Sequence, residues 1–219
     1  EAYKFVSKDQ IAAITMAKDR LIKTETALKK QLKQIKITES GTKITKSFVP
    51  LSSVGCYVPG GLARYPSSAI MSVVPAKLAG VEKIVMVTPP NKQGKIDPMV
   101  LVAADICGAD LIFKVGGAHS IAALAYGTKT IPQVDKIVGP GGSFVTMAKY
   151  LVSDVVPIDM LAGPTELVIL ADDSANPKLV ALDLISQAEH SSDTRCCLIT
   201  TSRNLANKVA SEITKIISS

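Results

Sequence analysis

The chain has 219 residues, of which 47% are hydrophobic and 20% are charged, a balance that allows a substantial core in one or two domains. Aromatic residues make up only 4% of the chain and tryptophan is absent, so the core must be built from aliphatic side chains. The chain opens with no signal-peptide pattern and contains no apolar run long enough to cross a bilayer. We therefore expect a cytoplasmic protein without a membrane partner.

The net charge of +6 arises entirely in residues 1–50, which hold 11 Lys or Arg and 5 Asp or Glu. These lysines lie beside acidic residues along an expected helix, without the interleaved aromatic residues of a nucleic-acid surface. We therefore interpret them as a solvated helix face and expect no nucleic-acid partner. The four cysteines (Cys56, Cys107, Cys196 and Cys197) form no CxxC pair, which argues against a zinc ribbon or a disulfide framework and favours free thiols.

A long amphipathic helix is predicted near the N-terminus. Ser7 and Gln10 form a capping box, and apolar residues then recur every three or four positions up to Ile35. The pattern predicts a helix over residues 8–36. Its apolar stripe is narrow, so we expect it to pack against another domain or subunit.

After Gly41, short β-branched runs alternate with helical patterns. The expected strands are 53–58, 83–88, 111–115, 136–138, 167–171 and 197–201, and the expected helices are 68–78, 98–107, 119–126, 143–151, 177–188 and 205–217. This alternation predicts an α/β fold with parallel sheet covered on both faces.

Glycine clusters follow several of these strands, at 59–61, 116–117, 139–142 and 163–164. In open α/β sheets, ligands bind at the carboxyl ends of the strands. The cluster at 139–142 precedes a helix and could bring backbone amides to an anion, although Phe144 replaces the third glycine of GxGxxG. A structural turn explains this cluster equally well. His119, near another helix start, could bind a ligand as a neutral imidazole, but a surface or core histidine is the plainer interpretation.

A second group of polar residues closes the helix that begins at Asn176-Pro177. Asp183, Gln187 and His190 are spaced by four and three, which places them on one helix face. An amide oxygen beside an imidazole nitrogen suits a small polar ligand or a metal ion. With two histidines in separate segments, a three-His zinc site cannot form within one chain, and HExxH and GxSxG motifs are absent from the sequence. Thr165 and Glu166 follow a Gly-Pro turn and suit either substrate binding or turn capping.

Taken in order, the motifs resemble those of histidinol dehydrogenases over about 54–200. The strongest matches are GCYVPGG at 55–61, KVGGA at 114–118, VDKIVGPG at 134–141, IDM at 158–160, AGP at 162–164 and SQAEH at 186–190. The resemblance implies an NAD-dependent, two-step oxidation of L-histidinol to L-histidine in histidine biosynthesis, in which zinc orients the substrate and a glutamate-histidine pair handles protons. It also implies a homodimer that shares sites between chains.

The same resemblance implies an aldehyde dehydrogenase-like fold of two Rossmann-like units. Residues 57–163 would form a unit inserted in the other, which 1–56 and 164–219 would build in part. By residue, it implies that Gln187 and His190 bind zinc and substrate, that Thr165 contacts substrate, and that Tyr57, His119 and Gly142 contact NAD. The family usually has glutamine at His119, asparagine at Gly142 and proline at Leu161. The catalytic glutamate-histidine pair and the remaining zinc ligands find no match in this chain, so we expect the 219 residues alone to be inactive.

Two alternatives remain open at the sequence level. One is a shortened, non-catalytic homologue that binds a nucleotide or metabolite, or that assembles through its basic helix. The other is a different aldehyde dehydrogenase-like enzyme, which would need a nucleophilic cysteine. Cys107 and Cys196 lie in poor local contexts for that role, since neither has a histidine nearby in sequence.

Overall fold

The structure is a computed structural model that describes residues 1–60, 64–161, 166–189 and 194–218. The chain separates into two compact units, residues 1–161 and 162–219. The expected arrangement, in which residues 57–163 form a unit inserted in another built from 1–56 and 164–219, stays a prediction.

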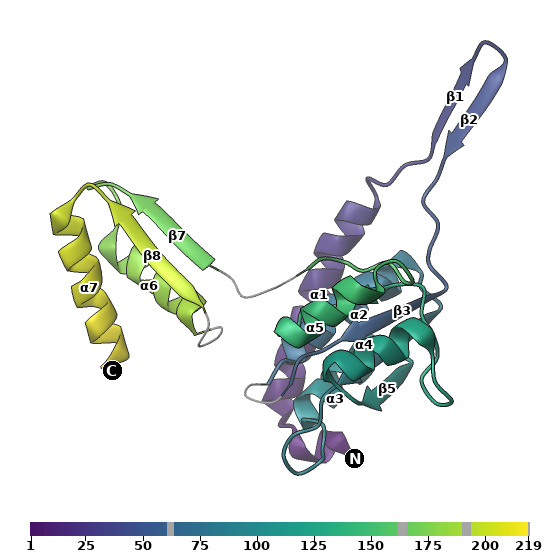
Figure 1. The fold of residues 1–219 in the computed structure, drawn as a ribbon, viewed down its shortest axis with the longest axis horizontal. Helices are drawn as coiled ribbons and strands as arrows, with labels where there is room; N and C mark the ends of the chain where they lie inside the picture. The colour runs from purple at the N-terminus through teal and green to yellow at the C-terminus, as the bar shows by residue number, and fades with distance from the viewer. Residues whose placement is uncertain (61–63, 162–165, 190–193, 219) are drawn as a thin grey trace. The chain divides into compact units, whose positions relative to one another are not determined.

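Unit 1 is built on a parallel sheet covered on both faces (Figure 1). The strand order is β5-β4-β3-β6, with β3 Ser53–Tyr57, β4 Lys83–Thr88, β5 Leu111–Lys114 and β6 Ile137–Val138. One face is covered by α1 (Lys8–Lys29), α2 (Pro66–Ala79) and α3 (Pro98–Cys107), and the other by α4 (Gly117–Tyr126) and α5 (Ser143–Val152). Apart from α1, these elements agree with the predicted ones to within a few residues, and they confirm the α/β class.

The apolar strands explain why helices lie on both sides of this sheet. Along β4, Ile84 and Met86 enter the core beneath α2 and α3, whereas Val85 and Val87 enter the core beneath α4. Successive side chains of a strand point to opposite faces, so a strand that is apolar at every position needs cover on both. The sequence therefore determines the three-layer arrangement of unit 1.

The N-terminal helix is shorter than predicted. A 3-10 turn (Ala2–Phe5) precedes α1, whose start has the capping box of Ser7 and Gln10, and α1 packs on α2 and α3 within unit 1. The prediction that the helix continues to residue 36 is wrong, because α1 ends at Lys29. The next residues form a β-hairpin of β1 (Ile35–Glu39) and β2 (Thr42–Lys46).

The hairpin has a local cause that the helical interpretation overlooked. Residues 35–38 alternate between isoleucine and polar residues, as do residues 43–45, and a Ser-Gly pair separates the two runs. Ser40 and Gly41 both adopt positive φ, 45° and 84°, as the tight turns favoured in hairpins require. Period-two alternation around such a turn is a stronger signal than the spacing of Leu28, Leu32 and Ile35, which seemed to extend the helix.

Unit 2 is a βαβα unit, with β7 (Glu166–Ala171) parallel to β8 (Arg195–Thr200) and with α6 (Pro177–Ala188) and α7 (Arg203–Ile217) packed together. Asn176 and Ser202 cap the two helices through side-chain oxygens, as expected for these residue types. Leu167 and Ile169 face the helices, whereas the outward face of β7 exposes Leu170 to 81%. Within the described residues, the sheet of unit 2 is covered on one face only. No described helix in either unit has the length and apolar character that a bilayer crossing would need.

A buried ion pair fixes the end of the sheet in unit 1. Lys149 of α5 is 2% exposed, and its ammonium group donates hydrogen bonds to the carbonyl of Gly139 and to the carboxylate of Asp159. Asp159 also accepts from the backbone N–H groups of Gly139 and Met160. Burial alone would raise the pKa of Asp159, but the bonds from Lys149 and from the two N–H groups outweigh it and lower the pKa.

We predict that Lys149→Met destabilises unit 1 by about 2–3 kcal/mol, because it leaves a partly buried carboxylate without its counter-charge. Adding Asp159→Asn should recover part of that loss, since the two residues act as a unit. Urea unfolding of the single and double variants measures both effects. If the loss of unfolding free energy in the double variant equals the sum of the losses in the two single variants, the two residues are not coupled.

The same pair predicts a pH dependence. Because the pKa of Asp159 is lower in the folded state than in the unfolded state, the pair contributes fully above about pH 4 and loses its contribution as the pH falls through the folded value. The stability difference between wild type and Lys149→Met should therefore shrink in acid.

Candidate functional site

Loops from three strands meet at the carboxyl edge of the unit 1 sheet, and glycines allow their close approach. Gly139 follows β6 with φ 113°, and a Cβ there would lie 2.1 Å from the carbonyl oxygen of Tyr57 at the end of β3. Gly116 follows β5, and a Cβ there would lie 2.4 Å from Cβ of Pro89, which follows β4. Larger residues at either position would push these loops apart.

Among the described α-helices, three begin without a side-chain cap: α2 after Tyr65, α4 after Gly116 and α5 after Gly142. The other four, α1, α3, α6 and α7, have capping side chains, and glycine is the N-cap residue only at α4 and α5. Gly142 has nothing within 4 Å of the position that a Cβ would take. An uncapped helix start presents backbone N–H groups and the positive end of the helix dipole. Both features suit an anionic group such as a phosphate.

Tyr57 ties the end of β3 to the start of α4. Its side chain is nearly buried, and its hydroxyl oxygen accepts a hydrogen bond of 3.3 Å from the backbone N–H of Gly117. Burial raises the pKa of Tyr57 and the Gly117 bond offsets only part of that rise, so the phenol is neutral at physiological pH. The visible role of Tyr57 is to position the helix start. Its expected contact with NAD stays a prediction.

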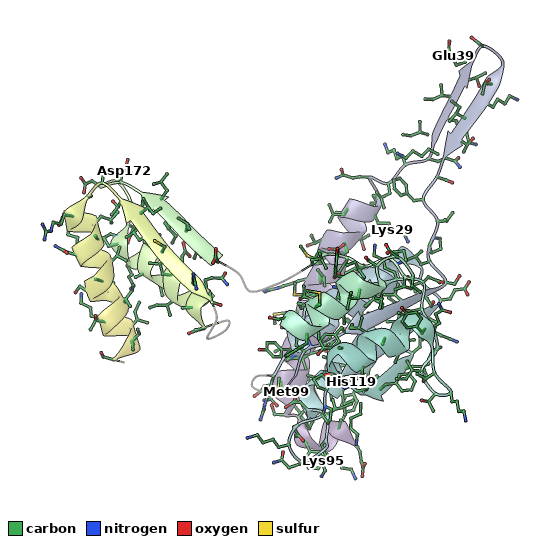
Figure 2. All side chains as sticks on the ribbon, viewed as in Figure 1. Lys29, Glu39, Lys95, Met99, His119 and Asp172 are labelled. Atoms are coloured by element: carbon green, nitrogen blue, oxygen red, sulfur yellow. The ribbon has the colours of Figure 1, made fainter. Side chains whose placement is uncertain are left out.

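His119 lies exposed in the first turn of α4, and Figure 2 labels it on that helix. Its Nδ1 lies 3.3 Å from the carbonyl oxygen of Gly116, which can only accept, so Nδ1 carries the proton. In the neutral ring, Nε2 is then left as an acceptor. The three expected cofactor residues, Tyr57, His119 and Gly142, thus all belong to elements that end or begin at one sheet edge.

Lys149 and Asp159 are functional candidates that the sequence analysis did not identify. They hold the carbonyl and the N–H of Gly139, the residue on which the approach of β6 to Tyr57 depends. The sequence did contain an indication of this pair, because the helical spacing places Lys149 on the same buried face of α5 as Val145 and Val152. A lysine on the apolar face of a helix needs an acidic side chain or a carbonyl oxygen as a buried partner.

The second expected group lies in unit 2 and is only partly described. Gln187 is half-buried in the last turn of α6, and Asp183, one turn earlier, is exposed. Thr165 and His190 lie outside the described residues, so their geometry relative to Gln187 stays a prediction. Among the residues with described positions, no three His, Cys, Asp or Glu side chains gather closely enough to hold a metal ion. Gln187 by itself does not constitute a zinc site.

The buried cysteines are poor nucleophiles. Burial raises the pKa of Cys56 to about 12 and that of Cys107 to about 11, so both stay as thiols at neutral pH. This weakens the alternative of an aldehyde dehydrogenase with a cysteine nucleophile at Cys107.

Comparisons with known proteins match this chain throughout. The sequence profile of the histidinol dehydrogenase family covers residues 1–219. Histidinol dehydrogenase of Clostridium acetobutylicum is 51% identical over 214 residues, which are 97% of this chain and 49% of that protein. The Listeria monocytogenes serotype 4b enzyme is 58% identical over 166 residues, 76% of this chain and 39% of its own length.

Solved structures give the same result. Histidinol dehydrogenase from Elizabethkingia anophelis superposes with a TM-score of 0.90 at 38% identity, over 99% of this chain and 50% of that one. Propionaldehyde dehydrogenase from Rhodopseudomonas palustris, solved with bound propionyl-CoA, has a TM-score of 0.58 at 15% identity, over 97% and 54% of the two chains, a likeness of fold alone. The chain thus spans about half the length of the curated relatives that cover most of it. With its whole length matched by one family profile, the chain belongs to the histidinol dehydrogenase family.

Proposed function

We propose that the protein containing this chain oxidises L-histidinol to L-histidine with NAD, in histidine biosynthesis in the cytoplasm, with zinc orienting the substrate and two copies forming a homodimer. The observation that carries the proposal is the match of the family profile to every residue of the chain.

The carboxyl edge of the unit 1 sheet is the proposed NAD site. NAD, when bound, would supply the hydride acceptor for both oxidation steps. The chain's own contribution is to bind and orient: the N–H groups at the starts of α4 and α5 would receive the pyrophosphate, and Tyr57 would hold the first of these helices in place. His119 offers Nε2 as an acceptor for a hydroxyl of the cofactor.

Unit 2 is the proposed location of substrate binding. Gln187 and His190 would supply an amide oxygen and an imidazole nitrogen to zinc, and Thr165 would offer its hydroxyl to the substrate. The described residues leave this donor set incomplete. The proton-transfer pair and the other zinc ligands would have to come from residues outside this chain.

Comparing the 219-residue chain with the intact gene product tests this division. With L-histidinol, NAD and zinc, the intact protein should produce NADH, whereas the isolated chain should be slower by at least about 10²–10⁴-fold, the usual effect of losing a general base. Absorbance of NADH measures both rates. Comparable turnover by the isolated chain would place the essential pair within these residues and contradict the proposal.

A charge introduced at Gly142 tests the NAD site. Gly142→Asp should stabilise α5 slightly, because aspartate caps a helix better than glycine and space is free around the position. It should also weaken NAD binding by at least about tenfold, because the carboxylate repels phosphate at the helix start.

The matched control is Gly142→Asn, which offers a similar cap without the charge. It should leave the NAD dissociation constant within about threefold of wild type, a difference below 1 kcal/mol. Calorimetric titration of the intact protein measures these constants. If Asp and Asn variants bind NAD equally well, the pyrophosphate does not lie at α5.

A non-catalytic homologue is the second candidate function. It is favoured by His119 and Gly142, which stand where the family usually has glutamine and asparagine. Calorimetry of the intact protein with NAD and, separately, with histidinol discriminates the two. A stable folded protein that binds neither ligand would support an assembly role.

A further inference from the structure

The β1–β2 hairpin projects from unit 1 without cover. All ten of its strand residues are exposed, and it extends beyond α1 and the sheet (Figure 1). Ile37 and Ile44 are cross-strand partners, yet they are 52% and 54% exposed. An isolated two-stranded hairpin is marginally stable in water. Exposed paired isoleucines on such a hairpin indicate that something packs on it in the assembled protein.

The two faces of the hairpin differ sharply in chemistry. The register places three cross-strand pairs on one face: Glu39 with Thr42 at the tip, Ile37 with Ile44 in the middle, and Ile35 with Lys46 at the base. The opposite face carries only lysine and threonine, in the pairs Lys36–Thr45 and Thr38–Lys43. The first group is called the isoleucine face below. It is the face that requires a partner.

We infer that the isoleucine face packs against the same face of a second copy of this chain, with the two hairpins antiparallel about a two-fold axis. This inference rests on the homodimer of the proposed function and names the surface that forms it. A two-fold contact must be self-complementary, since one patch meets its own copy. The isoleucine face meets that requirement.

The two charged residues of the isoleucine face lie at its opposite ends, which favours an antiparallel contact. The acidic residue lies at the tip, where Figure 2 labels Glu39, and the basic residue Lys46 lies at the base. In the antiparallel arrangement, Ile37 and Ile44 pack on their own copies, and each tip pair lies over the partner's base pair. Each Glu39 then lies over Ile35 of the other copy and diagonally opposite its Lys46, within reach of two equivalent ion pairs between the copies. A parallel arrangement would instead place like charges together at both ends.

The first test places a charge in the apolar centre of the intact protein. Ile37→Lys should raise the dimer dissociation constant by at least about 100-fold, because a central apolar contact is replaced by a buried, unpaired ammonium. The matched control is Thr38→Lys, the same new residue on the opposite face, which should leave the constant within about threefold. Sedimentation equilibrium over a concentration series gives the constants, and circular dichroism confirms that the variants fold.

The second test uses charge complementation between copies. Glu39→Lys and Lys46→Glu, each alone, should weaken dimerisation by about tenfold or more, because each homodimer has two like-charge contacts. An equimolar mixture of the two should form heterodimers with near wild-type affinity, since both contacts regain opposite charges. Glu39 and Lys46 are not paired within one hairpin, so this rescue reports a contact between chains.

The outcomes separate this inference from the proposed function. A wild-type dimer that all three interface variants leave intact would overturn the hairpin contact while the proposed enzyme and its dimer stand. A wild-type protein that stays monomeric throughout the series would overturn both the contact and the proposed homodimer, whatever its activity with histidinol. Weakening by Ile37→Lys without rescue in the mixture would show that the face packs on something other than its own copy, and would also overturn the inference.

Discussion

The approach of β6 to the carbonyl of Tyr57 is the constraint on which the edge of the unit 1 sheet depends. Gly139 allows that approach because it has no Cβ, and Lys149 and Asp159 hold its carbonyl and its N–H. The loop after β6 leads directly into α5, so the position of that helix start follows from the same contacts. A buried ion pair rarely adds much net stability, but it fixes one geometry, because any other arrangement leaves a charge without a partner.

The ion pair also matters for the electrostatics of the edge. A lone carboxylate at Asp159, bonded to the N–H of Gly139, would repel an anion from the adjoining glycine loop. Lys149 neutralises that charge, so the positive ends of α4 and α5 set the local potential. By contrast, four helix starts with no expected ligand have a capping side chain, from Ser7, Asp97, Asn176 and Ser202. Side-chain oxygens are missing at the starts of α2, α4 and α5, and the proposed phosphate would take their place at α4 and α5.

Sequence patterns predicted much of this fold because its signals are local. Continuous apolar strands, the Asn-Pro helix start and the glycine clusters are each local signals, and the observed bounds of α3, α6 and β4 equal the predicted ones. The hairpin was missed because Leu28, Leu32 and Ile35 continue a helical stripe when only every third or fourth residue is considered. The Lys149–Asp159 pair was missed because pairing across ten residues depends on tertiary packing. The positioning role of Tyr57 required coordinates for the same reason, since its partner Gly117 is 60 residues away.

The strands differ in how much of their surface is buried, and this difference indicates which parts of the chain are complete as they stand. The central strands β3 and β4 of unit 1 are buried on both faces, the strands of unit 2 on one, and the hairpin on neither. The proposed NAD edge is built from unit 1 residues only, so nucleotide binding depends on contacts that are already in place. Oxidation of a substrate needs more, because among the described residues unit 2 offers Gln187 without a set of metal ligands around it. Under the proposed function, binding and turnover are therefore separable: a variant at Gly142 would change NAD binding directly, whereas groups beyond the described donor set would have to supply turnover.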